Sequence, residues 1–182
     1  MIITVSGEPG AGKSTVARLL AKKLGYDFLS IGSLLRKLGL TNHKDILGMN
    51  KEALKKEKID KELDKHLIMI SKSRDNVVVD ARLGFFFIKK SVKIFLKVND
   101  IVGAKRIFLS KRKTEGYKSI ITALFSIYLR KHFEVERYKR LYYINPYNTK
   151  HYDLVIDTTR LSPEEVVSII IQFLIENNKL NI

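Results

Sequence analysis

The sequence predicts a three-layer α/β fold, in which helices cover both faces of a parallel β-sheet. Short apolar runs alternate with longer amphipathic segments along the chain, as in repeated βαβ units. Most of these runs are rich in Val, Ile or Phe and do not alternate with polar residues, which is typical of strands buried on both faces. The 182 residues, 45% of them apolar, are enough for the core of one compact domain.

Five segments are expected to form the strands: residues 2–6, 27–29, 76–80, 92–97 and 152–157. The last helix has a clear start, with Ser162 as the capping residue, Pro163 at the first helical position and Glu165 at the third. Two lysine-containing helical regions, 30–73 and 117–143, lie between strands. In the second, an apolar face is expected to pack against the domain; it consists of Ile120, Ile121, Leu124, Phe125, Tyr128 and Leu129.

The first strand leads into a segment that fits the phosphate-binding pattern GxxxxGK[ST], residues 7–14. Its glycines allow a tight turn that aims backbone N–H groups at phosphate oxygens. Lys13 is expected to reach the outer phosphates and to act in catalysis, while the Ser14 hydroxyl is expected to ligate Mg²⁺. A following helix would point its positive end at the phosphates. The predicted nucleotide-binding residues are Gly7, Glu8, Pro9, Gly10, Ala11, Gly12, Lys13, Ser14 and Thr15.

Two other strand ends carry candidates for a second anion site. Asp80 ends a predicted central strand, where α/β sheets bind ligands, and is expected to hold Mg²⁺; Arg82 is expected to point into the same cleft. The alternatives are a helix cap or turn for Asp80 and a surface salt bridge for Arg82. Ser30, Gly32 and Arg36 follow the second strand, where a helix N-terminus and a guanidinium suit a monoester phosphate.

In order and spacing, several segments resemble those of the nucleoside monophosphate kinases, most closely the short archaeal-type cytidylate kinases. They are residues 7–14, 30–36, 59–64, 80–82, 137–139, 152–157 and 161–166. The resemblance implies a single P-loop domain over residues 1–182 with a five-stranded parallel core at 1–29, 74–105 and 150–182. It also implies a monophosphate-binding insert at about 30–73 and a helical lid at about 106–149. The implied reaction is ATP plus CMP or dCMP giving ADP and the diphosphate.

The same resemblance assigns roles to individual arginines. Arg36 and Arg82 match arginines that bind the acceptor's phosphate, and Arg82 is a catalytic candidate as well. Arg130 and Arg137 keep the seven-residue spacing of catalytic lid arginines, which places both on one helix face. Arg106 and Arg112 fall on the stretch that leads into the lid. The chain departs from the pattern at Ala81, where a glycine is usual, and in an apolar lid that includes Phe133 and Val135.

The net charge of +15 leaves other functions open. The segment from Ala104 to Lys150 has twelve basic and three acidic residues, so it carries +9 of that charge. An adenylate kinase or another small-molecule P-loop kinase fits the same motifs, and the charge permits an RNA-associated ATP-binding protein. Small-molecule substrates, no obligatory nucleic acid, no membrane and a monomer are expected. With no cysteine, no apolar stretch of bilayer length and no signal-peptide pattern, a cytoplasmic location is expected.

Overall fold

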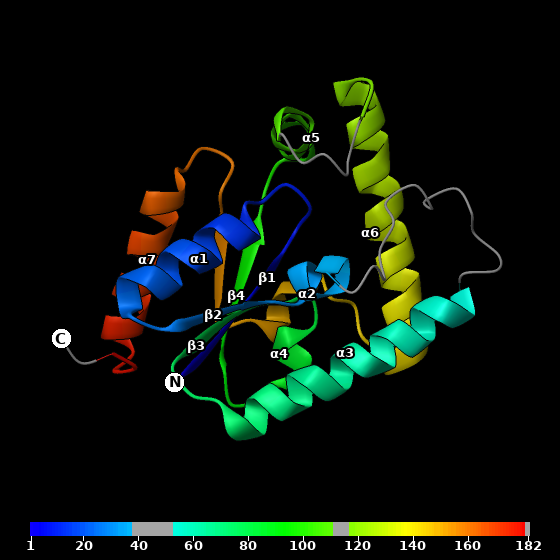
Figure 1. Ribbon diagram of the computed structural model, residues 1–182. Helices are drawn as coiled ribbons and strands as arrows, with labels where there is room; N and C mark the ends of the chain where they lie inside the picture. Colours follow the sequence, from blue (N-terminus) through cyan, green and yellow to red (C-terminus); the bar gives the residue numbers. More distant parts are fainter. Residues whose placement is uncertain (38–52, 111–116, 181–182) are drawn as a thin grey trace.

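The computed structural model describes residues 1–37, 53–110 and 117–180, apart from the side chains of residues 35–37 and 53–59. Its centre is a five-stranded, all-parallel sheet in the order β2-β3-β1-β4-β5 (Figure 1). This confirms the predicted three-layer α/β class and the five strands. The strands are β1 (Ile2–Gly7), β2 (Asp27–Ser30), β3 (Val77–Asp80), β4 (Val92–Lys97) and β5 (Leu154–Asp157).

The fifth strand begins two residues later than predicted. A short 3₁₀ turn, η2 (Thr149–His151), precedes it, and the Tyr152 N–H donates to the Thr149 carbonyl to close that turn. Backbone groups used in the turn are not available to the sheet, so pairing with β4 is delayed to Leu154.

Helices cover both faces of the sheet because β1 alternates its side chains between them. On one face, α1 (Lys13–Leu24) and α7 (Pro163–Glu176) pack on Ile3 and Val5. On the other face, Ile2 belongs to a cluster formed with α2 (Ile31–Lys37) and α3 (Ala53–Ser73), next to α4 (Gly84–Phe87) (Figure 1). No helix in the described part of the chain has both the length and the hydropathy needed to cross a membrane.

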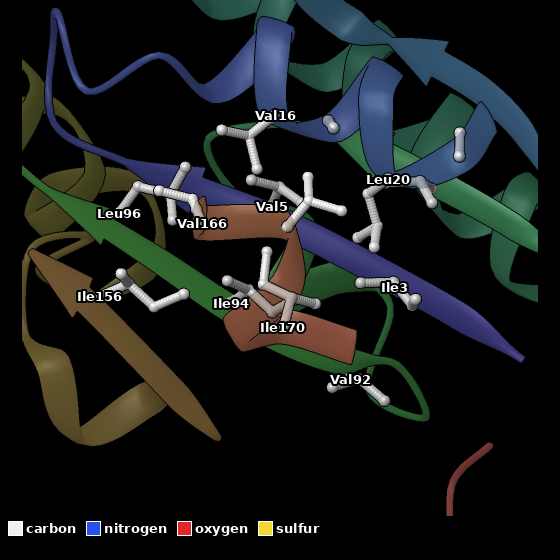
Figure 2. Packing of buried hydrophobic residues seen from close by; sticks show 14 of the residues in the cluster. Ile3, Val5, Val16, Leu20, Val92, Ile94, Leu96, Ile156, Val166 and Ile170 are labelled. Atoms are coloured by element: carbon white, nitrogen blue, oxygen red, sulfur yellow. The ribbon is translucent and has the colours of Figure 1, made fainter. Parts of the chain in front are cut away.

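The larger core fixes the position of α1 against the strand that precedes it. Val16 and Leu20 of α1 are at most 2% exposed and meet Val166 and Ile170 of α7 over the central strands (Figure 2). Burying side chains of this size stabilises the fold by about 1.5–3 kcal/mol each. The loop between β1 and α1 therefore spans two rigid elements. The start of α7 is capped as predicted, with the Ser162 hydroxyl accepting from the Glu165 N–H.

Two further helices, α5 (Asp100–Leu109) and α6 (Ile120–Tyr142), lie side by side beyond the carboxyl end of the sheet (Figure 1). Ala123 and Ile127 of α6 pack on Ala104 of α5. The predicted packing face of this region is wrong in part, because Ile121 and Phe125 are 78% and 60% exposed. Helix α5 packs on the side of α6 that carries Ala123 and Ile127, and the side that carries Ile121 and Phe125 is left exposed. The division into core, insert and lid stays a prediction.

Candidate active site

At two glycines, the backbone of the phosphate loop lies in close contact with β4 and α5. Gly7 has a φ of 147°, and a Cβ there would lie 2.3 Å from the Leu96 carbonyl oxygen of β4. Gly10 has a φ of 80°, and a Cβ there would lie 2.5 Å from the Cα of Gly103 in α5. Both the backbone conformation and the close approach exclude a side chain at these positions. The loop shape is thus held by β4 and α5 as well as by its own sequence.

Helix α1 begins directly after the loop and presents its N-terminus there. Gly12, with a φ of 81°, is the residue before the helix and supplies no side-chain cap. The Thr15 and Val16 N–H groups donate to the Gly12 carbonyl at 3.0 Å, and no side chain caps the N–H groups of Lys13 and Ser14 at the start of the helix. Together with the helix dipole, this end of α1 suits an anion.

Lys13 lies in a strongly positive environment. Its Nζ donates to the Glu8 carbonyl at 2.7 Å. Burial, and then repulsion from the guanidinium groups of Arg82 and Arg130, lowers the pKa of Lys13 to about 7, although the carboxylates of Asp80 and Glu134 act in the opposite direction. A lysine whose charge is opposed by two nearby cations is complemented by a polyphosphate.

Asp80 at the end of β3 brings three predicted residues together. Its Oδ2 accepts from the Ser14 hydroxyl at 2.5 Å and from the Ser30 hydroxyl at 3.1 Å, and the residue is 8% exposed. The oxygen-only donor set fits Mg²⁺, which takes one or two carboxylates and completes its shell with water and substrate phosphates. In the described part of the chain no three His, Cys, Asp or Glu side chains cluster as a metal site. Any magnesium would thus be shared with a bound phosphate.

Arg82 is held opposite the loop by a carboxylate that the sequence reasoning missed. Its guanidinium donates to the Gly7 carbonyl, and its Nε lies 2.9 Å from Oε2 of Glu134, which comes from α6. The other oxygen of Glu134 pairs with Arg130 Nε at 3.0 Å, and the Tyr147 hydroxyl donates to Oε2 at 2.5 Å. Although burial opposes it, Arg82 and then Arg130 lower the pKa of Glu134 to about 2. Glu134 therefore stays anionic.

Arg137 does not join this cluster. Its Nε lies 3.5 Å from Oδ2 of Asp60 in α3, and its guanidinium donates to the Tyr138 hydroxyl at 2.9 Å. The predicted common face of Arg130 and Arg137 is present in α6, but the two arginines have different partners. The catalytic role of both stays a prediction.

Four other residues were candidates from the sequence. Gly32 lies in α2, and Arg36 lies in the same helix with its side chain outside the described part; Arg112 is outside the described residues altogether. Arg106 binds the Thr158 carbonyl at 2.8 Å. Since the Thr158 hydroxyl also donates to the Ala11 carbonyl, Arg106 supports the loop from behind.

The side chain of Glu8 turns away from the phosphate position. It accepts from the Val98 N–H at 2.7 Å and from Lys131 Nζ at 3.0 Å, so it ties the loop to β4 and to α6. Of Glu8, only the backbone is therefore placed to contact a phosphate bound by the loop. Glu134 had a sequence signal, because it stands four residues after Arg130 and three before Arg137, on the same helix face. Tyr147 had none.

Comparison with known proteins identifies the family. Residues 6–115 match the family model described as "AAA domain", which covers more than half of the chain. Over 171 residues the chain is 36% identical to the cytidylate kinase of Methanobrevibacter smithii, with 94% of this chain and 96% of that protein covered. The chain belongs to the cytidylate kinase family. This membership agrees with the phosphate loop and the arginine cluster that faces it.

A longer relative and a solved structure extend this comparison. The chain is 34% identical over 180 residues to a protein of Lacinutrix mariniflava named S-adenosylmethionine-dependent nucleotide dehydratase, of which it spans 37%. Among solved structures, the shikimate kinase of Bacteroides thetaiotaomicron has a TM-score of 0.63 at 17% identity, covering 96% of this chain and 98% of that one. At that identity, the structural likeness supports the shared P-loop kinase fold alone.

Proposed function

We propose that this protein transfers the γ-phosphoryl group of ATP to CMP or dCMP and releases ADP and CDP or dCDP. The observation that carries the proposal is the convergence of two cationic groups at one edge of the sheet. Lys13 belongs to the donor loop, and Arg82 lies close enough to lower the pKa of that lysine. Membership of the cytidylate kinase family supplies the acceptor class.

On the donor side, the loop amides and Lys13 would bind the β- and γ-phosphates of ATP. Ser14 and Asp80 would hold Mg²⁺, which would supply positive charge against the negative charge of the phosphates. The 2.5 Å hydrogen bond between these two side chains already sets both oxygens at the start of α1. The protein therefore supplies alignment and positive charge on this side.

On the acceptor side, Arg82 and Arg130 would bind the 5′-phosphate of CMP and the migrating phosphoryl group. The Glu134 carboxylate forms ion pairs with both guanidinium groups. A phosphate dianion would therefore bind the two arginines beside this carboxylate or displace it. Phosphoryl transfer passes through a loose transition state, for which positioned cations are the main requirement. Arg137 would contact the acceptor farther from its phosphate. Closure of α6 over the cleft would exclude water as a competing acceptor.

A panel of acceptors tests the proposal. Purified protein is incubated with ATP·Mg²⁺ and CMP, dCMP, UMP, AMP or shikimate, and ADP formation is measured with a coupled assay. We expect the highest kcat/KM with CMP or dCMP. Turnover of AMP or shikimate alone would instead indicate an adenylate kinase or another small-molecule P-loop kinase. No turnover with any acceptor, together with RNA binding that weakens steeply with salt, would favour the RNA-associated alternative.

A further inference from the structure

A lysine of α6 joins the phosphate loop to the two helices beyond the sheet. Lys131 Nζ lies 3.0 Å from Oε1 of Glu8 in the loop, and it also forms an ion pair with Asp100 at the start of α5. The side chains of Lys131 and Glu8 are 23% and 17% exposed. Although burial opposes it, hydrogen bonds to Asp100 and Glu8 raise the pKa of Lys131, so this lysine is charged. The roles proposed above do not use it.

Glu8 carries this contact into the phosphate loop. One of its carboxylate oxygens accepts from Lys131, and the other accepts from the Val98 N–H at 2.7 Å. Its backbone N–H donates to the Leu96 carbonyl at 2.9 Å. The Glu8 carbonyl accepts from Lys13 Nζ at 2.7 Å. A single residue, held by both its side chain and its backbone, therefore separates Lys131 from the catalytic candidate Lys13.

The neighbouring residue of α6 faces the other half of the site. Arg130 Nε lies 3.0 Å from Oε1 of Glu134, and the second oxygen of this carboxylate lies 2.9 Å from Arg82 Nε. Consecutive residues of an α-helix point about 100° apart, because one turn takes 3.6 residues. Arg130 and Lys131 therefore reach in two directions from one place on the helix. A displacement of α6 at Lys131 would change the distance between Lys13 and Arg130.

The contact between Lys131 and Glu8 should matter more to the rate than to stability. Ion pairs that are partly exposed contribute little to the free energy of unfolding. Alignment is far more sensitive, because a misplacement of about 1 Å can lower the rate of an enzymatic reaction about a hundredfold. Phosphoryl transfer depends chiefly on the positions of its cations.

We propose that Lys131 is a positioning residue for phosphoryl transfer. It holds Glu8, and through Glu8 the loop and Lys13, at a fixed distance from Arg130. Lys131 itself does not bind a phosphate in this role, because its ammonium group is bonded to a carboxylate that turns away from the phosphate position. The inference rests on the proposed function and adds the residue that aligns its two halves.

The test measures kcat and the KM values for ATP and CMP in the full chain. Lys131→Met should lower kcat about 10- to 100-fold, because Lys13 and Arg130 remain but are no longer aligned. Both KM values should change less than about threefold, since the groups that would bind the substrates are kept. Lys131→Arg should recover kcat to within about fivefold of the wild type, because a guanidinium can bond both carboxylates. Lys139→Met, at an exposed lysine of the same helix, is the matched control and should keep the wild-type kcat.

A double-variant cycle tests whether Lys131 acts through Glu8. Glu8→Gln removes the charge that pairs with Lys131, so it should lower kcat as well. When Glu8→Gln and Lys131→Met are combined, kcat should fall no further than in the more severe single variant, because both changes break the same contact. A fall equal to the product of the two single effects would mean that the two residues act independently, and the inference would be wrong.

Other outcomes separate this inference from the proposed function. If the wild type phosphorylates no monophosphate, the proposed function itself is wrong. If the wild type phosphorylates CMP and Lys131→Met keeps its kcat, Lys131 only joins the helices to the loop. A raised KM for ATP with an unchanged kcat would mean that Lys131 binds the donor directly, which also contradicts the inference. If Lys131→Met does not fold, as judged by circular dichroism, Lys131→Gln decides through the same kcat.

Discussion

The proposed donor half and the proposed acceptor half of the site are built in different ways. The donor half is one continuous stretch, residues 7–15, that follows a single strand and opens a single helix. The acceptor half gathers Arg82, Arg130, Glu134 and Tyr147 from a strand end, a long helix and a loop. A site made of one continuous stretch depends on the local backbone conformation. A site made of residues from several elements depends on how the whole chain folds. This difference explains why the donor half could be predicted from the sequence, whereas the acceptor half could be predicted only in part.

The two halves also differ in how their charge is balanced. Lys13 in the donor half has a pKa lowered to about 7 by burial and by repulsion from Arg82. The acceptor arginines have Glu134 between them, and this carboxylate has a pKa lowered to about 2. A donor phosphate would therefore relieve a repulsion, whereas an acceptor phosphate would compete with an internal anion. Substitutions in the two halves should consequently have different signatures.

Arg82→Ala should give the largest effect and should act mainly on the acceptor half. It removes a guanidinium that is 12% exposed and bonded to Glu134 and Gly7. Loss of one preorganised group that stabilises transition-state charge costs about a hundred- to a thousandfold in rate, so kcat/KM for CMP should fall by that factor. Steady-state kinetics would measure it, with the KM for ATP nearly unchanged. Arg74→Ala, at an exposed ion pair with Asp27, is the control. An unchanged kcat and KM for CMP would remove Arg82 from the acceptor site.

Gly10→Ala should show that the donor half depends on its backbone. A φ of 80° strains any other residue by about 1–2 kcal/mol, and the new Cβ would meet the Gly103 backbone at 2.5 Å. Overpacking adds about 1–3 kcal/mol, so the free energy of unfolding should fall by about 3 kcal/mol in total. Gly12→Ala is the matched variant, because its φ is 81° but nothing lies within 4 Å, and it should lose only about 1 kcal/mol. Equal losses in urea unfolding would contradict the close approach between the loop and α5.

The sequence was sufficient for the parts that depend on local chemistry. The phosphate loop, the five strands and the Ser162 cap each follow from adjacent residues, and their predicted places hold except for the start of β5. The approach of Asp80 to Ser14 followed from a general rule, since the carboxyl ends of neighbouring parallel strands meet at one edge of a sheet.

The parts that the sequence did not predict depend on which elements touch. Glu134 could have been singled out by its spacing from two arginines, but its bond to Arg82 required α6 to come close to the segment that follows β3. The apolar stripe of α6 could be seen in the sequence, but which side of it packs on α5 could not, and Phe125 lies on the exposed side. Tyr147 lies in a loop without periodicity, so no pattern connected it with Glu134.

Glu134→Gln should lower the free energy of unfolding and increase the stabilisation that bound CMP provides. The change leaves Arg82 and Arg130 without their counter-charge. Breaking a fully buried pair costs about 3–5 kcal/mol, but Arg130 is 46% exposed and partly solvated, so a loss of about 2 kcal/mol is expected in urea unfolding. Bound CMP should restore more stability in this variant than in the wild type, because its phosphate replaces the missing anion. Exposed Glu136→Gln should change neither value.

The pH dependence of the same variant gives an independent check. The pKa of Glu134 is lowered from 4.5 to about 2 in the folded state, so its contribution is complete above about pH 4.5. It is lost as the pH falls toward 2, because the carboxylate then takes up a proton in the folded protein. The stability difference between wild type and Glu134→Gln should therefore narrow over this window. A constant difference would mean that the carboxylate charge is not what holds the arginines.

Lys13 gives the most direct measure of the donor half. With a folded pKa of about 7 against an ordinary 10.5, Lys13 is mostly neutral at pH 8, and stability should rise between about pH 7 and 10.5. Bound phosphates would raise this pKa, so ATP binding at pH 8 should take up most of one proton. Calorimetry in two buffers of different ionisation enthalpy measures that uptake. It should disappear in Lys13→Met and persist in Lys22→Met, at the far end of α1. Because the acceptor arginines stay protonated throughout, CMP binding should take up far fewer protons than ATP binding. Equal proton uptake for both ligands would contradict the proposed difference between the two halves.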